Sequence, residues 1–338
     1  MNPMTTTAEM VQTPLIRLAH PLAFAALLKK VGTPTDSLFR RVGLPVYCQD
    51  PTAFVPLKQA WALFDAAAQL EDLALGWHVG RFFGDNRLSA GLLQKIEHAP
   101  TLYQALYRFV RLVSAEASHL ELGILEHPDD IVLHTRYSTI KDWSGYASSQ
   151  SYQIGVFVDL IRQYVGPEWD PPGIGLECPT VPTVAQEHFP GSQFRLSQKV
   201  GYVTIPRSYL HLGPRGGAQS VPDETPVHLA WDFDFIDTLK AVVKAYLEDG
   251  YPSASKMASL TDSSARTLFR RLSERGLTYQ SLVDEVRFEQ ATELLQNQDL
   301  QITEISRSVG FNDPSHFSRM FRRVGGLNPG EFRASLRA

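Results

Sequence analysis

The sequence predicts two domains: an α+β domain with helices first and a small antiparallel sheet after them, then an all-α domain with two tandem helix-turn-helix units. A chain of 338 residues is long enough for two hydrophobic cores. Apolar residues recur at helical spacing near both ends of the chain and alternate in its middle. Residues 212–230, rich in Gly and Pro, separate the two patterns as a linker. We therefore expect domains at residues 14–211 and 231–338.

Composition points to a soluble protein of a reducing compartment. Hydrophobic residues make up 43% of the chain and charged residues 20%, and no apolar run has the length of a membrane span. The N-terminus lacks the basic start and apolar core of a secretory signal. Two distant cysteines, Cys48 and Cys178, favour neither a disulfide framework nor a zinc cluster. We expect a cytoplasmic protein with no membrane partner, no metal and no cofactor.

The N-terminal region changes its hydrophobic period partway along. Helical stripes of apolar residues lie at 57–64, 75–82, 102–113 and 156–164. Alternating segments, which predict strands, lie at 120–124, 131–135, 174–178, 194–196 and 202–205. The first two are separated by Pro128-Asp129-Asp130, which predicts a hairpin turn.

The C-terminal end carries the most specific pattern. Ile302, Ile305 and Val309 share one helical face, and Gly310 is the kind of residue that ends a helix. A second helix is then expected, capped by Asn312 or Asp313, with Pro314 in its first turn. Phe317 and Phe321 lie four residues apart on that helix, and its other faces are basic and polar. A short helix, a glycine turn and a basic helix predict a helix-turn-helix for the DNA major groove.

Ser-His-Phe-Ser-Arg-Met-Phe-Arg-Arg at 315–323, with the later Gly326, Asn328, Pro329 and Phe332-Arg333, resembles the signature of the AraC/XylS family. The resemblance implies a bacterial transcription regulator that binds double-stranded promoter DNA and is not an enzyme. It also implies RNA polymerase as a partner. The alternative is an amphipathic helix pair in an unrelated domain.

Another helix-turn-helix with a less typical sequence is expected before the one just described. In chain order it is the first unit, and the one just described is the second unit. Leu268, Arg270 and Leu272 recur 49 residues later as Phe317, Arg319 and Phe321. Between the units, apolar residues from Thr278 to Gln296 predict one long connector helix, and the core of the DNA-binding domain spans about 236–333. The first unit departs from the family pattern at Asp262, where relatives usually have glycine, and at Phe269, where they often carry a polar residue. Aspartate can still adopt the left-handed conformation.

The resemblance also implies which side chains face DNA. The base-facing candidates are Arg266, Phe269 and Arg270 in the first unit and Pro314, Ser315 and Arg319 in the second. Arginine suits guanine because its fork donates twice, and an aromatic side chain can pack on a thymine methyl group. The phosphate candidates are Arg271, Thr278, Arg322 and Arg323. A solvated surface role is the alternative for each of these residues.

Net charge does not oppose DNA binding. The chain carries −4, but residues 263–276 hold four arginines against one acid, and residues 313–337 hold five against two. Local clusters of positive charge attract phosphate more directly than the total charge does.

The N-terminal half shows no catalytic constellation. Its scattered histidines (His78, His98, His119, His127 and His134) are expected in core or surface roles. Asp232, Asp234 and Asp237 are read as acids at a helix start rather than as metal ligands. The segment 188–210 resembles a metabolite-responsive branch of the same family. That resemblance implies effector sensing, a homodimer and an effector-responsive activator, with no ligand-contacting residue assigned. An enzyme or a ligand-independent scaffold with an appended DNA-binding module remains the alternative.

Overall fold

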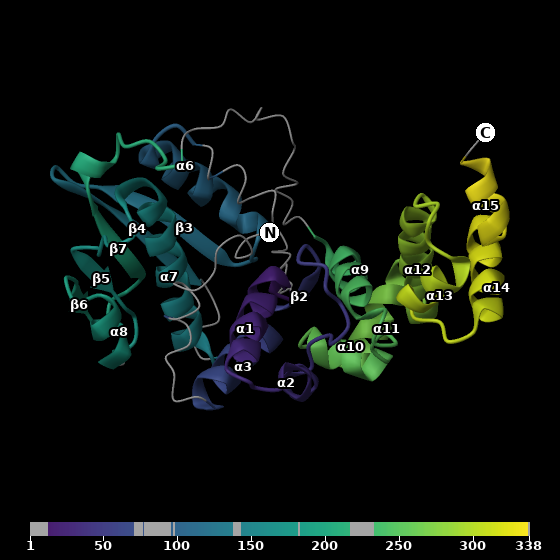
Figure 1. Cartoon of the computed structure of the whole chain (residues 1–338). Helices are drawn as coiled ribbons and strands as arrows, with labels where there is room; N and C mark the ends of the chain where they lie inside the picture. Colours follow the sequence, from purple (N-terminus) through teal and green to yellow (C-terminus); the bar gives the residue numbers. More distant parts are fainter. Residues whose placement is uncertain are drawn as a thin grey trace, which may run out of the picture. The chain divides into compact units, whose positions relative to one another are not determined.

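The computed structural model describes residues 13–70, 77, 96, 99–137, 143–181, 183–216 and 233–336. The chain divides into two compact units, which lie largely within residues 16–231 and 232–338 (Figure 1). None of the helices in the described part is long and apolar enough to cross a membrane.

The N-terminal compact unit, which lies largely within residues 16–231, begins with helices, as the apolar spacing predicts. Its elements before the sheet are β1 (Leu15–Arg17), α1 (Ala19–Lys30), α2 (Thr35–Val42), β2 (Phe54–Pro56), α3 (Leu57–Leu70), α6 (Leu102–Leu112) and the 3-10 turn η1 (Val113–Ala115). β1 pairs with β2, a small sheet that the sequence did not indicate. Trp61 and Phe64 on α3 are fully buried, which confirms that helical stripe. The stripe predicted at 75–82 and the positions of His78 and His98 lie outside the described residues.

The predicted hairpin and strands are present. The larger sheet contains β3 (Leu120–Glu126), β4 (Asp130–Tyr137), β5 (Gly173–Gly175), β6 (Gln193–Arg195) and β7 (Gly201–Pro206). Among the described residues its order is β3-β4-β7-β5-β6, antiparallel except for the β5–β6 pair. The register sets Ile131 opposite Ile205 and Leu133 opposite Val203, and all four side chains are buried. This face of the sheet therefore forms part of the core.

Helix α7 (Tyr146–Val165) packs against β7 and α3, and covers the sheet (Figure 1). It begins ten residues before the predicted helix, because its first half buries polar side chains that break the apolar pattern. Two of these are Ser149 and Gln153, and the Gln153 amide oxygen accepts a 2.9 Å hydrogen bond from the Thr135 hydroxyl on β4. The remaining elements of the unit are α8 (Thr183–His188) and the turn η2 (Arg207–Tyr209).

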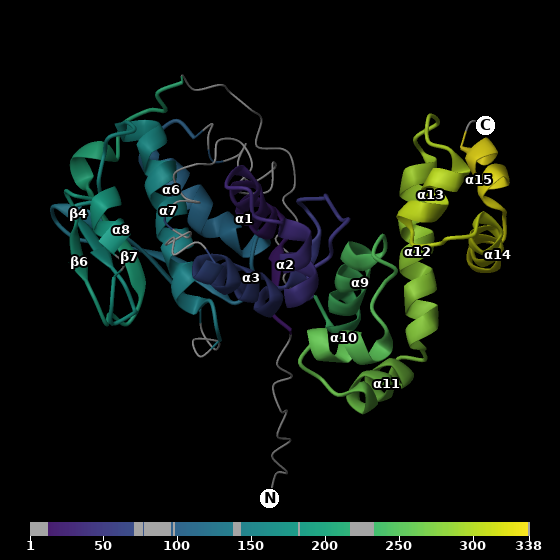
Figure 2. The same ribbon diagram turned by 60° about the horizontal axis from the view of Figure 1, so that its bottom comes forward.

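The C-terminal compact unit, which lies largely within residues 232–338, is all helical in its described residues. It contains α9 (Phe235–Tyr246), α10 (Ala254–Leu260), α11 (Ala265–Glu274), α12 (Tyr279–Leu295), α13 (Ile302–Ser308), α14 (Pro314–Gly325) and α15 (Pro329–Ser335). Helix α12 joins α9, α10 and α11 at one end to α13, α14 and α15 at the other (Figure 2). Buried residues occur on more than one face of α12, because it packs against α9, α13, α14 and α15. Two tandem helix-turn-helix units on one connector are thus confirmed.

Candidate nucleic-acid interface

Helix α11 is the second helix of the first helix-turn-helix. It begins at its cap Ser264, whose hydroxyl accepts a 3.1 Å hydrogen bond from the Thr267 amide. Leu268 and Leu272, one turn apart, are fully buried against the unit's core. Because these two leucines fix which face is inward, Arg266, Phe269 and Arg270 face solvent, and half of the Phe269 surface is exposed.

The arginines of α11 differ in what they contact. Arg270 forms an ion pair with Glu274 one turn later, whereas Arg266 makes no ion pair with any described residue. Arg271, a predicted phosphate ligand, lies half-buried with its guanidinium carbon 4.9 Å from the centre of the Phe235 ring on α9. This cation–π contact holds part of its guanidinium against the fold. Arg271 is therefore less available to a phosphate than its sequence position suggested.

The turn of the first helix-turn-helix, between α10 and α11, is formed without glycine. Asp262 adopts the left-handed conformation, with φ 44°, as its short polar side chain allows. Thr261, the residue before it, is buried, and its hydroxyl donates to the Met257 carbonyl at 2.9 Å. The hydroxyl is thereby satisfied inside the core. The fold therefore accommodates Asp262, the departure from the family pattern that lies in the turn.

The second unit follows the predicted design. Helix α13 ends at Ser308, and Gly310 two residues later has a φ of +78° and leaves no room for a Cβ beside the Leu247 carbonyl oxygen. Asp313 caps α14 by accepting a 2.8 Å hydrogen bond from the Ser315 amide, and Pro314 occupies the first turn. Phe317 and Phe321 are fully buried. The side chains of Pro314, Ser315 and Arg319 are exposed beside the cap, as a base-reading surface requires.

Helix α14 presents free cations as well as a paired one. Within the described residues, Arg319 and Arg322 are exposed and make no ion pair. Arg323, another predicted phosphate ligand, donates to Asp284 on α12 at 2.5 Å, and 65% of its side chain is still exposed. Backbone hydrogen bonding from Ser315, with His316 and Arg319 nearby, lowers the pKa of Asp313 from its ordinary value. Among the described residues, the unpaired positive charge of α14 thus lies at the middle of the helix, at Arg319, and in its last turn, at Arg322.

The connector α12 starts in the predicted way. Thr278 caps it by accepting a 3.0 Å hydrogen bond from the Ser281 amide, and the Ser281 hydroxyl accepts one from the Thr278 amide at 2.9 Å. The helix has 17 residues, which corresponds to about 26 Å at 1.5 Å per residue. Its Thr278 side chain is exposed, so a phosphate could approach this helix end.

Two charged residues of α12, Asp284 and Arg287, hold this helix against the second helix-turn-helix. The sequence did not predict this role for them. Arg287, only 5% exposed, donates from Nε to the Val309 carbonyl at 3.1 Å and from a terminal nitrogen to the Gly310 carbonyl at 2.9 Å. Its guanidinium lies between the rings of Tyr251 and Phe311, at 4.5 and 4.1 Å. Buried Asp284 lies 4.0 Å from it and also accepts from Arg323. We call Asp284, Arg287 and Arg323 the connector clamp.

The clamp had a weak sequence signal. Arg287 falls one turn after the apolar Val283, on a face of the connector helix that is buried. An arginine on a buried stripe marks a side chain with designated acceptors, because buried charges need partners. Burial lowers the pKa of Arg287 from its ordinary value, while Tyr251 and Asp284 raise it.

The other candidate chemistry is structural. Asp234 and Asp237 form a capping box at the start of α9, and Arg275 pairs with Asp234 at 2.9 Å. Asp232 lies outside the described residues. Across the part of the chain that the structure describes, no group of three His, Cys, Asp or Glu side chains is arranged to hold a metal ion.

Comparison with known families gives two matches. Residues 32–213, more than half of the chain, match the model of the arabinose-binding domain of the AraC transcription regulator, N-terminal. Residues 257–335 match the model of a helix-turn-helix domain.

Individual proteins match over shorter lengths. The HTH-type transcriptional regulator VqsM of Pseudomonas aeruginosa is 37% identical over 90 residues, covering 27% of this chain and 28% of the relative. The HTH-type transcriptional activator RhaS of Escherichia fergusonii is 40% identical over 93 residues, covering 26% and 34%. The chain thus spans about a third or less of these curated relatives. The solved transcriptional regulator CdpR of Pseudomonas aeruginosa aligns over 94% of this chain and 98% of its own, at 19% identity and a TM-score of 0.39.

Proposed function

This chain belongs to the AraC family of transcription regulators, which are DNA-binding proteins and not enzymes, and we propose that it reads DNA through α11 and α14 in successive major grooves. The observation that supports this most is the connector. It is one capped helix of about 26 Å, comparable with the rise of one DNA turn, roughly 34 Å. A connector of that length suits two helices that enter the same face of the duplex.

The proposed contacts follow the exposed faces. Arg266, Phe269 and Arg270 on α11 and Pro314, Ser315 and Arg319 on α14 face bases, and Arg322 and Thr278 face phosphates. Arg270 must leave Glu274 to reach a base, and Arg271 and Arg323 already contact Phe235 and Asp284. The second unit, whose Arg319 is unpaired among the described residues, therefore contributes more to base recognition than the first.

The rest of the chain is assigned the regulatory role. We propose that residues 14–211 form an effector-binding and dimerisation domain, that 212–230 link it to the DNA-binding domain, and that 231–338 bind DNA. Support comes from the matched model, whose description names a ligand-binding domain. On this proposal the protein is a cytoplasmic, effector-responsive activator that pairs with a second copy and contacts RNA polymerase.

The two-groove proposal is tested by changing the spacing of the target. Each monomer should protect two short clusters about 10 base pairs apart. Inserting about five base pairs between the clusters turns one of them to the opposite face, and affinity should fall to that of a single cluster. The same insertion placed outside the clusters is the control. Unchanged affinity after the internal insertion would mean that α14 alone reads bases.

A further inference from the structure

Strand β3 forms one edge of the larger sheet. It is the first strand in the order β3-β4-β7-β5-β6, and none of the described strands pairs with its outer side. The β3–β4 hairpin shows which backbone groups face that side. His127 N–H donates to the Asp130 carbonyl at 2.9 Å, which makes these two residues a hydrogen-bonded pair, and such pairs alternate along an antiparallel ladder. The N–H and C=O groups that point away from β4 therefore belong to Leu120, Leu122, Ile124 and Glu126.

The edge of β3 lacks the features that keep exposed strands from pairing. Proteins commonly protect an edge with a lysine, a proline, a bulge or a very short strand. β3 is seven residues long, contains neither lysine nor proline, and keeps an unbroken register with β4. Its two acids are paired within the chain, since Glu121 contacts Arg136 at 2.6 Å and Glu126 contacts Arg207 at 2.8 Å. The edge is therefore suited to accept another strand.

Side chains on the inner face of β3 are only partly covered. Leu122 lies opposite Thr135 of β4, and directly opposed residues share one face of the sheet. Ile124 lies opposite Leu133 on the same face. Both β4 residues are buried, whereas both β3 residues are partly exposed, because β3 has a neighbouring strand on only one side in the described sheet. A strand added along β3 would cover these apolar side chains as β3 covers those of β4.

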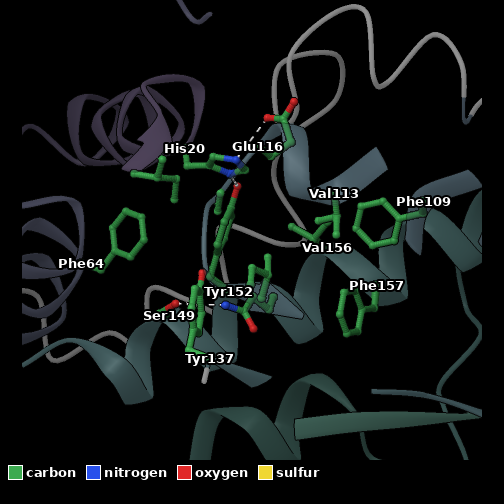
Figure 3. A pocket seen from close by; sticks show the side chains of 14 residues that line it. His20, Phe64, Phe109, Val113, Glu116, Tyr137, Ser149, Tyr152, Val156 and Phe157 are labelled. Atoms are coloured by element: carbon green, nitrogen blue, oxygen red, sulfur yellow. Dashed lines mark hydrogen bonds and ion pairs between the residues drawn. The ribbon is translucent and has the colours of Figure 1, made fainter. Parts of the chain in front are cut away.

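Helix α6, which packs against β3, carries an exposed aromatic patch. Its inner face presents Phe109, which lines a small cavity together with Phe157 of α7 (Figure 3). Its outer face presents Tyr103 and Tyr107, which are 38% and 53% exposed. The two rings stack with their centroids 6.1 Å apart, so they form one patch. Tyrosine is enriched where proteins bind one another, because its ring buries a large area while its hydroxyl keeps a hydrogen bond.

The sequence of β3, Leu-Glu-Leu-Gly-Ile-Leu-Glu, matches itself when two copies run antiparallel with Gly123 opposite Gly123. In that register all seven residues pair, and the outward-pointing groups of Leu122 meet those of Ile124 in the second copy. The two glycines form a non-hydrogen-bonded pair, where antiparallel strands approach most closely and a small residue fits. Shifting the strands along each other would leave outward-pointing groups without partners at both ends.

The charges of β3 favour the same register. Glu121 of one copy lies opposite Leu125 of the other, and Glu126 lies opposite Leu120. Like charges directly opposite each other destabilise a sheet, and no glutamate faces another glutamate in this arrangement. Shorter overlaps centred on Glu121 or on Glu126 would instead set two carboxylates face to face.

We propose that two copies of this chain pair through β3, antiparallel and centred on Gly123, so that their larger sheets join into one. The inference rests on the proposed pairing with a second copy, and it names the surface that forms the pair. Two-fold symmetry selects a second copy over another partner, because the same residues then complete both sides of an isologous contact. The joined strands also leave neither copy with an exposed β3 edge. Tyr103 and Tyr107 lie on the helix next to the joined strands and add aromatic area to the contact.

A pair of engineered cysteines in the full-length protein tests the contact and its register. Glu121 and Leu125 of opposite copies form a non-hydrogen-bonded pair, in which the Cα atoms lie about 4.5 Å apart, close enough for a disulfide. Within one chain the same two positions are about 13 Å apart along the strand, too far for an internal disulfide. Glu121→Cys combined with Leu125→Cys should therefore oxidise to a covalent dimer on a non-reducing gel. Each single variant is the matched control, because its new cysteine lacks the partner while Cys48 and Cys178 are unchanged.

Charge at position 125 gives a reversible measure of the same contact. Leu125 is 52% exposed in the single chain, so both glutamate and lysine should leave its fold unchanged. Leu125→Glu sets a carboxylate opposite Glu121 of the second copy at both symmetric positions, whereas Leu125→Lys sets a cation there. Opposite charges favour a cross-strand pair and like charges oppose it, so the dissociation constant of the glutamate dimer should be about tenfold higher than that of the lysine dimer. Sedimentation equilibrium measures both constants.

Three results would overturn the proposal. An unmodified protein that stays monomeric would contradict both the pairing with a second copy and the β3 contact. A dimer that is crosslinked no more in the double-cysteine variant than in the single variants would contradict the β3 contact alone. Equal dissociation constants of the glutamate and lysine variants would contradict the register. DNA binding of the unmodified protein is measured separately, so its loss would count against the proposed DNA contacts and not against β3.

Discussion

Replacing Arg287 with methionine should weaken the contact between the second helix-turn-helix and the connector helix α12. Methionine keeps most of the aliphatic stem but removes the two hydrogen bonds to the Val309 and Gly310 carbonyls and one cation beside Asp284. A hydrogen bond from a charged donor contributes about 1.5–3 kcal/mol. Removing one partner of a buried charge cluster costs about 3–5 kcal/mol. We therefore expect the local free energy of opening to fall by about 3–5 kcal/mol.

Hydrogen exchange measures this opening locally, amide by amide. At about 1.4 kcal/mol per tenfold change, amides of α13 and of the turn at Gly310 should exchange between two and three and a half powers of ten faster, up to the limit set by global unfolding. Exchange of the amides in the N-terminal compact unit should be unaffected. The matched control is Arg307→Met, since Arg307 is exposed on α13 and has no ion pair among the described residues.

Two outcomes would refute the reasoning. If Arg287→Met accelerates exchange no more than Arg307→Met, the buried guanidinium contributes nothing beyond its stem. If Arg287→Lys restores full protection, a point charge suffices, and the two-pronged contact with adjacent carbonyls is not what stabilises the turn.

Three further predictions concern the recognition helices. Arg319→Ala should weaken specific DNA binding by about 1–3 kcal/mol and relax preference at one base pair, measured by anisotropy against random DNA with the exposed Arg195→Ala as control; equal loss on both DNAs would make Arg319 a phosphate ligand. Glu274→Gln should strengthen binding by about 0.2–1 kcal/mol because it frees Arg270, and the gain should vanish when Arg270→Ala is added. The lowered pKa of Asp313 means that its contribution to stability is present above its ordinary pKa of 3.8 and is lost as pH falls through the lower folded value. Asp313→Asn, which still caps, should therefore flatten melting temperature against pH below about pH 4, and an unchanged acid limb would contradict this.

Local patterns predicted the elements whose causes are local. Phe317 and Phe321 lie one turn apart and are both buried, and Gly310 takes the positive φ expected of a helix end. Asp262 occupies a turn position where glycine is usual, because aspartate can adopt the left-handed conformation that the turn requires. In each case the physical cause spans fewer than about five residues, so the sequence contains all of it.

Features that depend on tertiary partners were missed. Strands β1 and β2 have three residues each and adjoin helices α1 and α3, so their apolar residues cannot be told apart from the start of those helices. The first half of α7 buries Ser149 and Gln153, whose polarity hides the helix until Thr135 on β4 is seen beside them. The side chains of His20 and Glu116 are buried 3.3 Å apart although they lie far apart in the chain, and no local pattern around either residue predicts the pairing. Polar groups placed inside a core are readable only together with their partners.

The clamp and the exposed arginines together explain why the two units should differ in function. The second unit has a glycine turn that approaches the Leu247 carbonyl closely, and Arg287 fixes the carbonyls of that same turn. Its position relative to α12 is therefore held by buried contacts, while Arg319 stays unpaired among the described residues. In the first unit the corresponding Arg270 is engaged by Glu274 and must exchange one partner for another on binding. Arg319 gives up no ion pair with a described residue when it meets a base, whereas Arg270 must first leave Glu274. We therefore expect α14 to set the sequence preference, and α11 to add affinity once α14 has fixed the register.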